Sequence, residues 1–328
     1  MSRDADSPID KKTLWAIITV VVLAVLVLAL ILVLRERRQE QPQQPPAPAP
    51  GQGPGPEQLP FPGPTAPADT SVHLTLGNPS GATDDPANAD NYLMRKPYFA
   101  LSYNNGKGAP NWVSWALTAS DLGSAPRVEF YPDTSLPNTF RHITPHDYAG
   151  SGFDRGHLCP HSDRASTPEA SRATFEMTNM VPQAPHLNQQ AWADMEDYCR
   201  SMVKRRPQAL YIIAGPSGQG GEGSKGPAES IGKGRVVVPA KCWKVVLAVE
   251  NGTGSADDLG RVNSGSRAIA VVMPNDQSVG HGWARYRTSV AEVEALTGYK
   301  FFDRVPQDII KPLKARVDDE TVTSPRRP

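Results

Sequence analysis

The chain has 328 residues, enough for one large domain or two small ones, and its 34 basic residues equal its 34 acidic ones. Six of the basic and seven of the acidic residues precede residue 71, so the rest carries 28 Lys and Arg against 27 Asp and Glu. This balance excludes a uniformly basic nucleic-acid binder, and any phosphate binding must come from a local arrangement of charge. Three cysteines, Cys159, Cys199 and Cys242, are too few for a dense disulfide framework.

The first feature in chain order is an apolar run from Leu14 to Leu34, which holds 21 residues without a charge. About 20 apolar residues span the hydrocarbon core of a bilayer. A cleaved signal peptide has a shorter run and a small-residue cleavage site, whereas this run ends in RERRQE. A buried core helix is disfavoured because the run has no polar face. We predict a short N-terminal segment over residues 1–13 and a single-pass transmembrane helix over residues 14–34.

A proline-rich linker is predicted over residues 35–70. Between Gln41 and Asp69 lie 11 of the 33 prolines, a composition that favours polyproline II and cannot bury a core. At about 3.1 Å per residue the segment reaches roughly 90 Å when fully extended. Because three basic residues lie on either side of the span, charge does not set its orientation. The long spacer favours a domain on the extracytoplasmic side of the membrane; a cytosolic domain on a tether is the alternative.

Residues 71–312 are expected to form one folded domain, followed by a flexible tail over residues 313–328. Apolar and β-branched runs predict central strands of one sheet at residues 111–119, 209–215, 234–250 with a break at Pro239, and 267–275. Helices are predicted over residues 186–206 and 289–298. The second helix has a Ser289 cap, Glu292 in a capping box and a terminal Gly298. Strands around isolated helices indicate an α+β fold.

The glycine-rich stretch from Gly215 to Pro227 invites comparison with a phosphate-binding loop. That motif requires a glycine directly before a lysine and then Ser or Thr. Here Ser224 precedes Lys225, so the order is wrong. We predict a flexible surface loop.

The segment FDRGHLCPHSD, from Phe153 to Asp163, places an arginine and a histidine two residues apart. On a strand, Arg155 and His157 would point to one face, and Gly156 would leave room for close approach to a ligand. A histidine can deprotonate water near neutral pH, and a guanidinium can bind the phosphate under attack. The structural alternative for Arg155 is a salt bridge to Asp154 or Glu196. His157, Cys159 and His161 also permit a zinc site, although Pro160 disturbs a regular strand.

A second polar segment, TNMVPQAPHLNQQAWADMED, follows from Thr178 to Asp197. Asn188, Trp192 and Glu196 are spaced four residues apart, which places them within about 80° of one another on a regular helix. Mg²⁺ takes oxygen ligands and retains several waters, so the single amide oxygen of Asn188 would suffice as its protein ligand. Trp192 is expected to pack in the core.

The paired segments resemble the DNA/RNA non-specific endonuclease family, the ββα-metal nucleases that include Serratia-type nuclease and mitochondrial endonuclease G. The resemblance extends in order over about residues 95–303. It implies a ββα-metal nuclease fold with a central, mainly antiparallel sheet. It further implies DNA and RNA as substrates, Mg²⁺ as cofactor with Mn²⁺ as a substitute, and 5′-phosphate products.

The resemblance also implies roles for single residues. His157 resembles the general base, Asn188 the direct Mg²⁺ ligand, and Glu196 the carboxylate that orients metal-bound water. Arg155 resembles the phosphate-contacting arginine of the DRGH motif.

Two further residues are expected on the substrate side of the site. Asn179 matches the asparagine of the family's N-x-x-P-Q segment, which is interpreted as supporting the site, and Arg127 is aligned with a second phosphate-binding arginine.

The leading hypothesis is a membrane-tethered endonuclease. The alternatives are a catalytically degenerate nucleic-acid-binding module displayed on a stalk, and a scaffold that binds a protein partner. The sequence leaves open whether the chain forms a homodimer, whether an inhibitor protein restrains it, and whether DNA or RNA is preferred.

Overall fold

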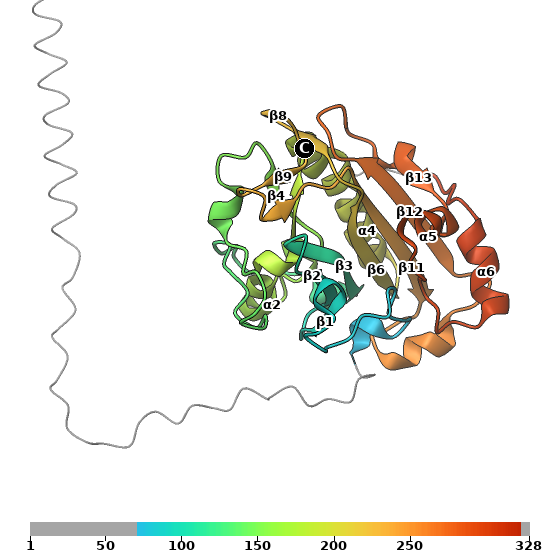
Figure 1. Cartoon of the computed structure of the whole chain (residues 1–328). Coiled ribbons are helices and arrows are strands. Elements are labelled where there is room, and N and C mark those ends of the chain that lie inside the picture. Colours follow the sequence, from blue (N-terminus) through green and yellow to red (C-terminus); the bar gives the residue numbers. More distant parts are fainter. Residues whose placement is uncertain (1–70, 323–328) are drawn as a thin grey trace, which may run out of the picture. The chain divides into compact units, whose positions relative to one another are not determined.

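A computed structural model of the chain describes residues 71–322 (Figure 1). The predicted transmembrane helix and proline-rich linker lie outside these residues. Within the described part, no helix combines the length and apolar character needed to cross a bilayer.

The described residues build a seven-stranded sheet in which every neighbouring pair is antiparallel. This confirms the predicted α+β class and the predicted antiparallel sheet. The strands, in sheet order, are β1 (Tyr92–Arg95), β2 (Ala100–Asn104), β3 (Ala109–Leu117), β6 (Gln208–Ser217), β11 (Lys241–Glu250), β12 (Arg267–Pro274) and β13 (Arg287–Thr288).

Three small two-stranded sheets surround the central one. They are β4 (Asp154–His157) with β5 (Met180–Gln183), β7 (Gly221–Gly223) with β8 (Gly226–Ala228), and β9 (Ser230–Ile231) with β10 (Val236–Val237). Two expectations were therefore wrong. Val236–Val237 pairs with β9 rather than with the central sheet, because the chain breaks at Pro239 before β11 begins. The glycine-rich stretch is not a plain loop, since its second half forms the β7–β8 hairpin.

The helices are α2 (Pro168–Ala173), α3 (Pro185–Leu187), α4 (Ala193–Arg205), α5 (Val290–Thr297) and α6 (Gln307–Ala315). Between α3 and α4 the chain makes a π-helical turn, η7 (Asn188–Trp192), so the predicted helix over residues 186–206 is not regular. The capping box of α5 and the left-handed glycine at its end are as predicted. Short 3₁₀ turns lie at residues 72–74, 89–91, 119–121, 145–148, 161–163, 177–179, 256–261 and 283–286.

The central sheet is buried on both faces, which explains why β11 is apolar along most of its length. Alternate residues of β11 enter two separate cores: Cys242 and Val246 face α4, whereas Trp243 and Val245 face α5 and α6. The antiparallel pair of β4 and β5, whose strands are joined by residues 158–179, is called the β4–β5 hairpin below. This pair and α2 lie on one side of the sheet, and α5 and α6 lie on the other (Figure 1).

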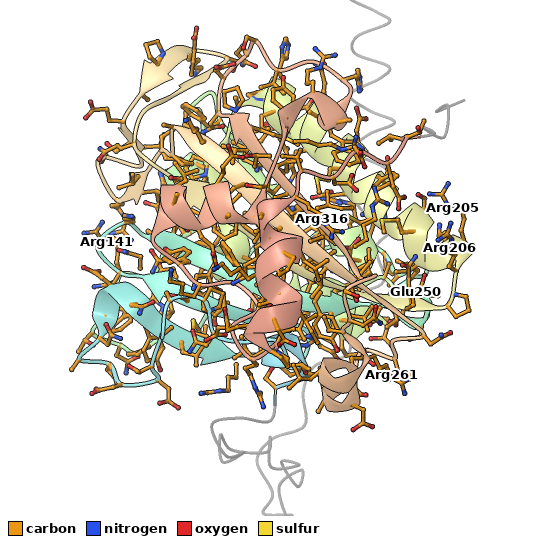
Figure 2. The ribbon with its side chains drawn as sticks, turned by 90° about the vertical axis from the view of Figure 1, so that its right-hand side faces the viewer. Arg141, Arg205, Arg206, Glu250, Arg261 and Arg316 are labelled. Carbon is orange, nitrogen blue, oxygen red and sulfur yellow. The ribbon has the colours of Figure 1, made fainter. Side chains whose placement is uncertain are left out.

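The second face is seen directly in Figure 2, where α5 and α6 cover the sheet. Arg316 follows α6 on this face. At one edge, Arg205 and Arg206 at the end of α4 lie beside Glu250 at the end of β11, and these three line a common pocket.

The expected domain boundary after residue 312 was wrong, because it falls inside α6. Leu313 is buried, and Asp318 forms ion pairs with Arg267 and Arg287. The predicted tail therefore begins with residues that belong to the folded domain.

A buried asparagine joins the β4–β5 hairpin to the central sheet. Asn275, which follows β12, donates to the backbone oxygens of Pro182 at 3.0 Å and Pro239 at 2.8 Å. Its Oδ1 accepts from the backbone nitrogen of Ala184 at 2.7 Å. These bonds satisfy backbone groups that no strand pairing reaches, and they fix the hairpin against the edge of the sheet.

We predict that Asn275→Ala lowers the free energy of unfolding by roughly 3 kcal/mol or more, because three buried backbone groups lose their partners. Urea unfolding of the protein, followed by circular dichroism, measures this change. Asn138→Ala is the matched control, since Asn138 is exposed and should leave stability nearly unchanged. Equal stability of the two variants would contradict the role assigned to Asn275.

Candidate active site

Five of the six predicted site residues line one pocket of about 490 Å³. Its walls are formed by β4, the 3₁₀ turn at residues 145–148 with the following residues 150–152, the segment at residues 127–130, and the start of η7 and α4. The polar side chains that line it are Arg127, Tyr148, Ser151, Asp154, Arg155, His157, His161, Ser162, Asn188 and Glu196.

His157 ends β4 and packs between two phenylalanine rings. Its ring centroid lies 5.3 Å from that of Phe130 and 5.1 Å from that of Phe175. Burial, together with the charges of Arg127 and His161, lowers the pKa of His157 to about 3, so the imidazole is neutral at pH 7. Nε2 is buried and has no hydrogen-bond partner within residues 71–322. Because Nε2 is enclosed, we assign Nδ1 as the ring nitrogen that faces the pocket lined by His157.

Two arginines flank this histidine, and each lies on an aromatic ring. Cζ of Arg155 is 4.7 Å from the centroid of Phe130, and Cζ of Arg127 is 5.0 Å from that of Phe175. Arg155 also makes a long hydrogen bond to the Pro145 oxygen at 3.5 Å. Among the described residues neither guanidinium forms an ion pair, so the alternative salt bridge from Arg155 is not made. Both arginines can therefore receive an anion.

The amide of Asn188 is held in one orientation by Asp154. Its Nδ2 donates to Asp154 Oδ2 at 2.8 Å, and Gln189 donates to the same oxygen at 2.9 Å. Because the nitrogen is engaged, Oδ1 is the amide atom left to act as an acceptor. An oriented amide oxygen beside the Asp154 and Glu196 carboxylates is the type of donor set that Mg²⁺ or another hard divalent cation prefers. The residues present therefore fit such an ion.

The zinc alternative finds no support. Over residues 71–322, no three His, Cys, Asp or Glu side chains converge on a point that could hold a metal. Cys159 is fully buried and lies behind the pocket rather than in its lining, and burial raises the pKa of its thiol.

Glu196 reaches the same pocket from α4, four residues after the end of the π-helical turn. Trp192 lies between Asn188 and Glu196 on the predicted helix face. It is buried, and its Nε1 donates to the His157 oxygen at 3.3 Å. Burial raises the pKa of Glu196 to about 6, against the opposing effect of Lys244 and Arg200. Its carboxyl group is therefore mostly ionised at pH 7.

The structure contradicts a substrate-binding role for Asn179, because the residue is fully buried. Its side chain accepts from the Cys159 nitrogen at 2.9 Å and donates to the oxygens of Cys159 at 2.8 Å and Thr174 at 2.9 Å. Asn179 thus supports the chain just after His157 from behind. The sequence suggested that Gly156 leaves room for a ligand. In the structure the Gln183 side chain fills this space, since a Cβ at Gly156 would meet it.

Sequence reasoning missed several residues that line the pocket or support it from beneath. Asp154 belongs to the quoted motif, and its position before the arginine was the available signal. Phe130 and Phe175 left no signal, because their role depends on loops folding over the histidine. Lys244 did leave one, as the single charge within the apolar run of β11.

Comparison with known proteins shows which proteins this chain is similar to. Residues 76–308 match the DNA/RNA non-specific endonuclease family. The chain is 46% identical to a nuclease from Nostoc sp. over 251 residues, which is 76% of this chain and 87% of the relative. It is 32% identical to the mitochondrial nuclease EXOG of Xenopus laevis over 260 residues, covering 76% of this chain and 67% of the relative.

A solved structure of the EndoG/EndoGI complex, which concerns the inhibition of EndoG, contains a similar fold. The TM-score is 0.59 at 25% sequence identity, and the match covers 75% of this chain and 96% of that one. The family match over most of the domain and the two relatives lead to one conclusion. The chain belongs to the DNA/RNA non-specific endonuclease family, whose members are metal-dependent phosphodiester hydrolases.

Proposed function

We propose that this chain hydrolyses the phosphodiester bonds of both DNA and RNA at the described pocket, with Mg²⁺ as its ion. The observation that supports this most strongly is the meeting of a neutral imidazole, two guanidinium groups without ion pairs and an oriented amide oxygen. The β4–β5 hairpin followed by η7 and α4 matches the ββα arrangement expected of such a site.

In the proposed reaction His157 accepts at Nδ1 the proton of a water molecule that attacks phosphorus in line with the 3′ oxygen. The bond from phosphorus to the 3′ oxygen breaks, so that oxygen leaves and takes a proton from solvent. The phosphate stays on the 5′ oxygen of the downstream nucleotide, and the upstream fragment ends in a 3′-hydroxyl. Because water rather than a 2′-hydroxyl is the nucleophile, ribose and deoxyribose substrates both react.

Arg155 and Arg127 bind the non-bridging oxygens, where charge grows as water attacks. Asn188 Oδ1 would hold the divalent cation, with Asp154 fixing the amide and Glu196 on the same wall of the pocket. When bound, Mg²⁺ neutralises charge on the phosphate and on the leaving oxygen.

We predict that His157→Ala lowers the rate of plasmid nicking by about 10²–10⁴-fold, because the proton acceptor is lost. The rate is measured on supercoiled plasmid and on RNA with Mg²⁺, and chelator should abolish the wild-type activity. His281→Ala is the control, since His281 is exposed, pairs with Asp194 and does not line the pocket.

The same assay separates an enzyme from a binding module. A module that only binds would shift plasmid in a gel with Mg²⁺ present but leave it uncut. Full activity of His157→Ala would count against the assigned base.

Asp154→Ala should raise the Mg²⁺ concentration needed for half-maximal nicking by about 10–100-fold, because the Asn188 amide loses the partner that orients it. A titration of nicking rate against Mg²⁺ measures this. Gln189→Ala is the matched control, because it removes the second donor to the same carboxylate and keeps the Asn188 bond. An equal shift in both variants would argue against the orienting role of Asp154.

We further propose that residues 14–34 anchor the protein in a membrane and that the nuclease domain lies on its extracytoplasmic side. The support is the charge-free length of 21 residues and the proline-rich spacer that follows. The full chain should stay with membranes through alkaline extraction, and added protease should remove the nuclease domain from intact cells. Recovery of the full chain in the soluble fraction would refute the anchor, and protection from protease would refute the orientation.

A further inference from the structure

A lysine lies at the centre of the domain, where the sheet is otherwise apolar. Lys244 is the fourth residue of β11, and its side chain is 1% exposed. Its strand neighbours on either side are Ala214 of β6 and Val271 of β12. By alternation it points to the face that carries α4, as Cys242 and Val246 do. An ammonium group in such surroundings is costly unless a partner balances its charge.

The partner is the carboxylate of Glu196. Nζ of Lys244 lies 3.6 Å from Glu196 Oε1, and within residues 71–322 no other carboxylate lies at ion-pair distance from it. The ammonium also lies 4.2 Å from the ring centroid of Trp192 and 5.7 Å from that of Trp115. The two indole rings cover part of the ammonium group, and its ion pair is made to Glu196.

The other cation near Glu196 is already balanced. Arg200 pairs with Asp163 at 2.8 Å and with Asp197 at 2.6 Å. This group of one arginine and two carboxylates carries a net charge of −1, so it cannot neutralise a third carboxylate. Lys244 is therefore the counter-charge that remains for Glu196.

We propose that Lys244 is a positioning residue for the reaction: from beneath the pocket, its ammonium holds the Glu196 carboxylate in place and balances its charge. The inference rests on the proposed hydrolysis. Lys244 does not line the pocket, so it acts through Glu196 and not on the substrate. Truncating it should consequently lower kcat and leave KM close to its wild-type value.

A double-mutant cycle tests this proposal on the full protein, with Lys244→Met, Glu196→Gln and the combined variant. Lys244→Met should lower kcat for plasmid cleavage by at least about 10-fold, and the combined variant should be no slower than Glu196→Gln alone. Lys241→Met is the control, because Lys241 is exposed on the same strand. The proposal would be overturned if the loss of kcat in the combined variant equals the product of the two single losses. It would also be overturned if Lys244→Met leaves kcat unchanged.

Stability measured by urea unfolding provides a second readout that does not need activity. Lys244→Met leaves a buried carboxylate without its counter-charge and should destabilise the fold, whereas the combined variant, which has neither charge, should recover much of the loss. If Lys244→Met fails to fold, folding of the combined variant still supports the pairing. Failure of both would overturn it. An inactive wild-type protein would refute the proposed function, while this stability cycle would still report on the pair.

Discussion

The site depends on one constraint, which is that buried backbone groups need hydrogen-bond partners. The β4–β5 hairpin is only four residues long on each strand and stands apart from the central sheet. Asn179 and Asn275 supply the bonds that strand pairing cannot, the first behind His157 and the second between β5 and the end of β12. Together with the hydrogen bonds from Asn188 to Asp154 and from Trp192 to the His157 oxygen, these two carboxamides hold β4 in a fixed relation to α4.

The second determinant is the local arrangement of charge in a domain that is nearly neutral overall. The pocket holds a neutral imidazole because two phenylalanine rings and a nearby guanidinium disfavour its proton. Two arginines without ion pairs lie beside it, and the carboxylates of Asp154 and Glu196 line the same pocket. Groups suited to a phosphate and groups suited to a metal ion thus line one pocket, which a uniformly basic surface would not achieve.

Each of the two carboxylates in the pocket is paired with a neighbouring side chain. Asp154 orients an amide, and Glu196 is paired with a lysine that projects from the central sheet. The sheet therefore does more than carry the hairpin, since one of its buried strands contributes a charge to the site. The opposite face of the sheet, covered by α5 and α6, contributes none of the residues that line the pocket (Figure 2).

Much of this molecule follows from its sequence. Apolar runs located most of the long strands, and the Ser289 capping box located α5, because these signals act between residues that are near one another in the chain. The spacing of Arg155 and His157 and the distance from Asn188 to Glu196 indicated the centre of the site for the same reason. The helix carrying the last two was expected to be regular, however, and the π-helical turn at its start was not foreseen.

Only the tertiary structure decided the rest. Whether Asn179 contacts substrate or supports the chain depends on which backbone groups lack partners, and those groups come from distant segments. The pairing of Lys244 with Glu196 joins residues 48 positions apart, and the enclosure of His157 joins loops on either side of β4. Local patterns report on neighbours along a strand or helix; burial and charge pairing depend on which elements pack together in space, and packing is settled by the whole core at once.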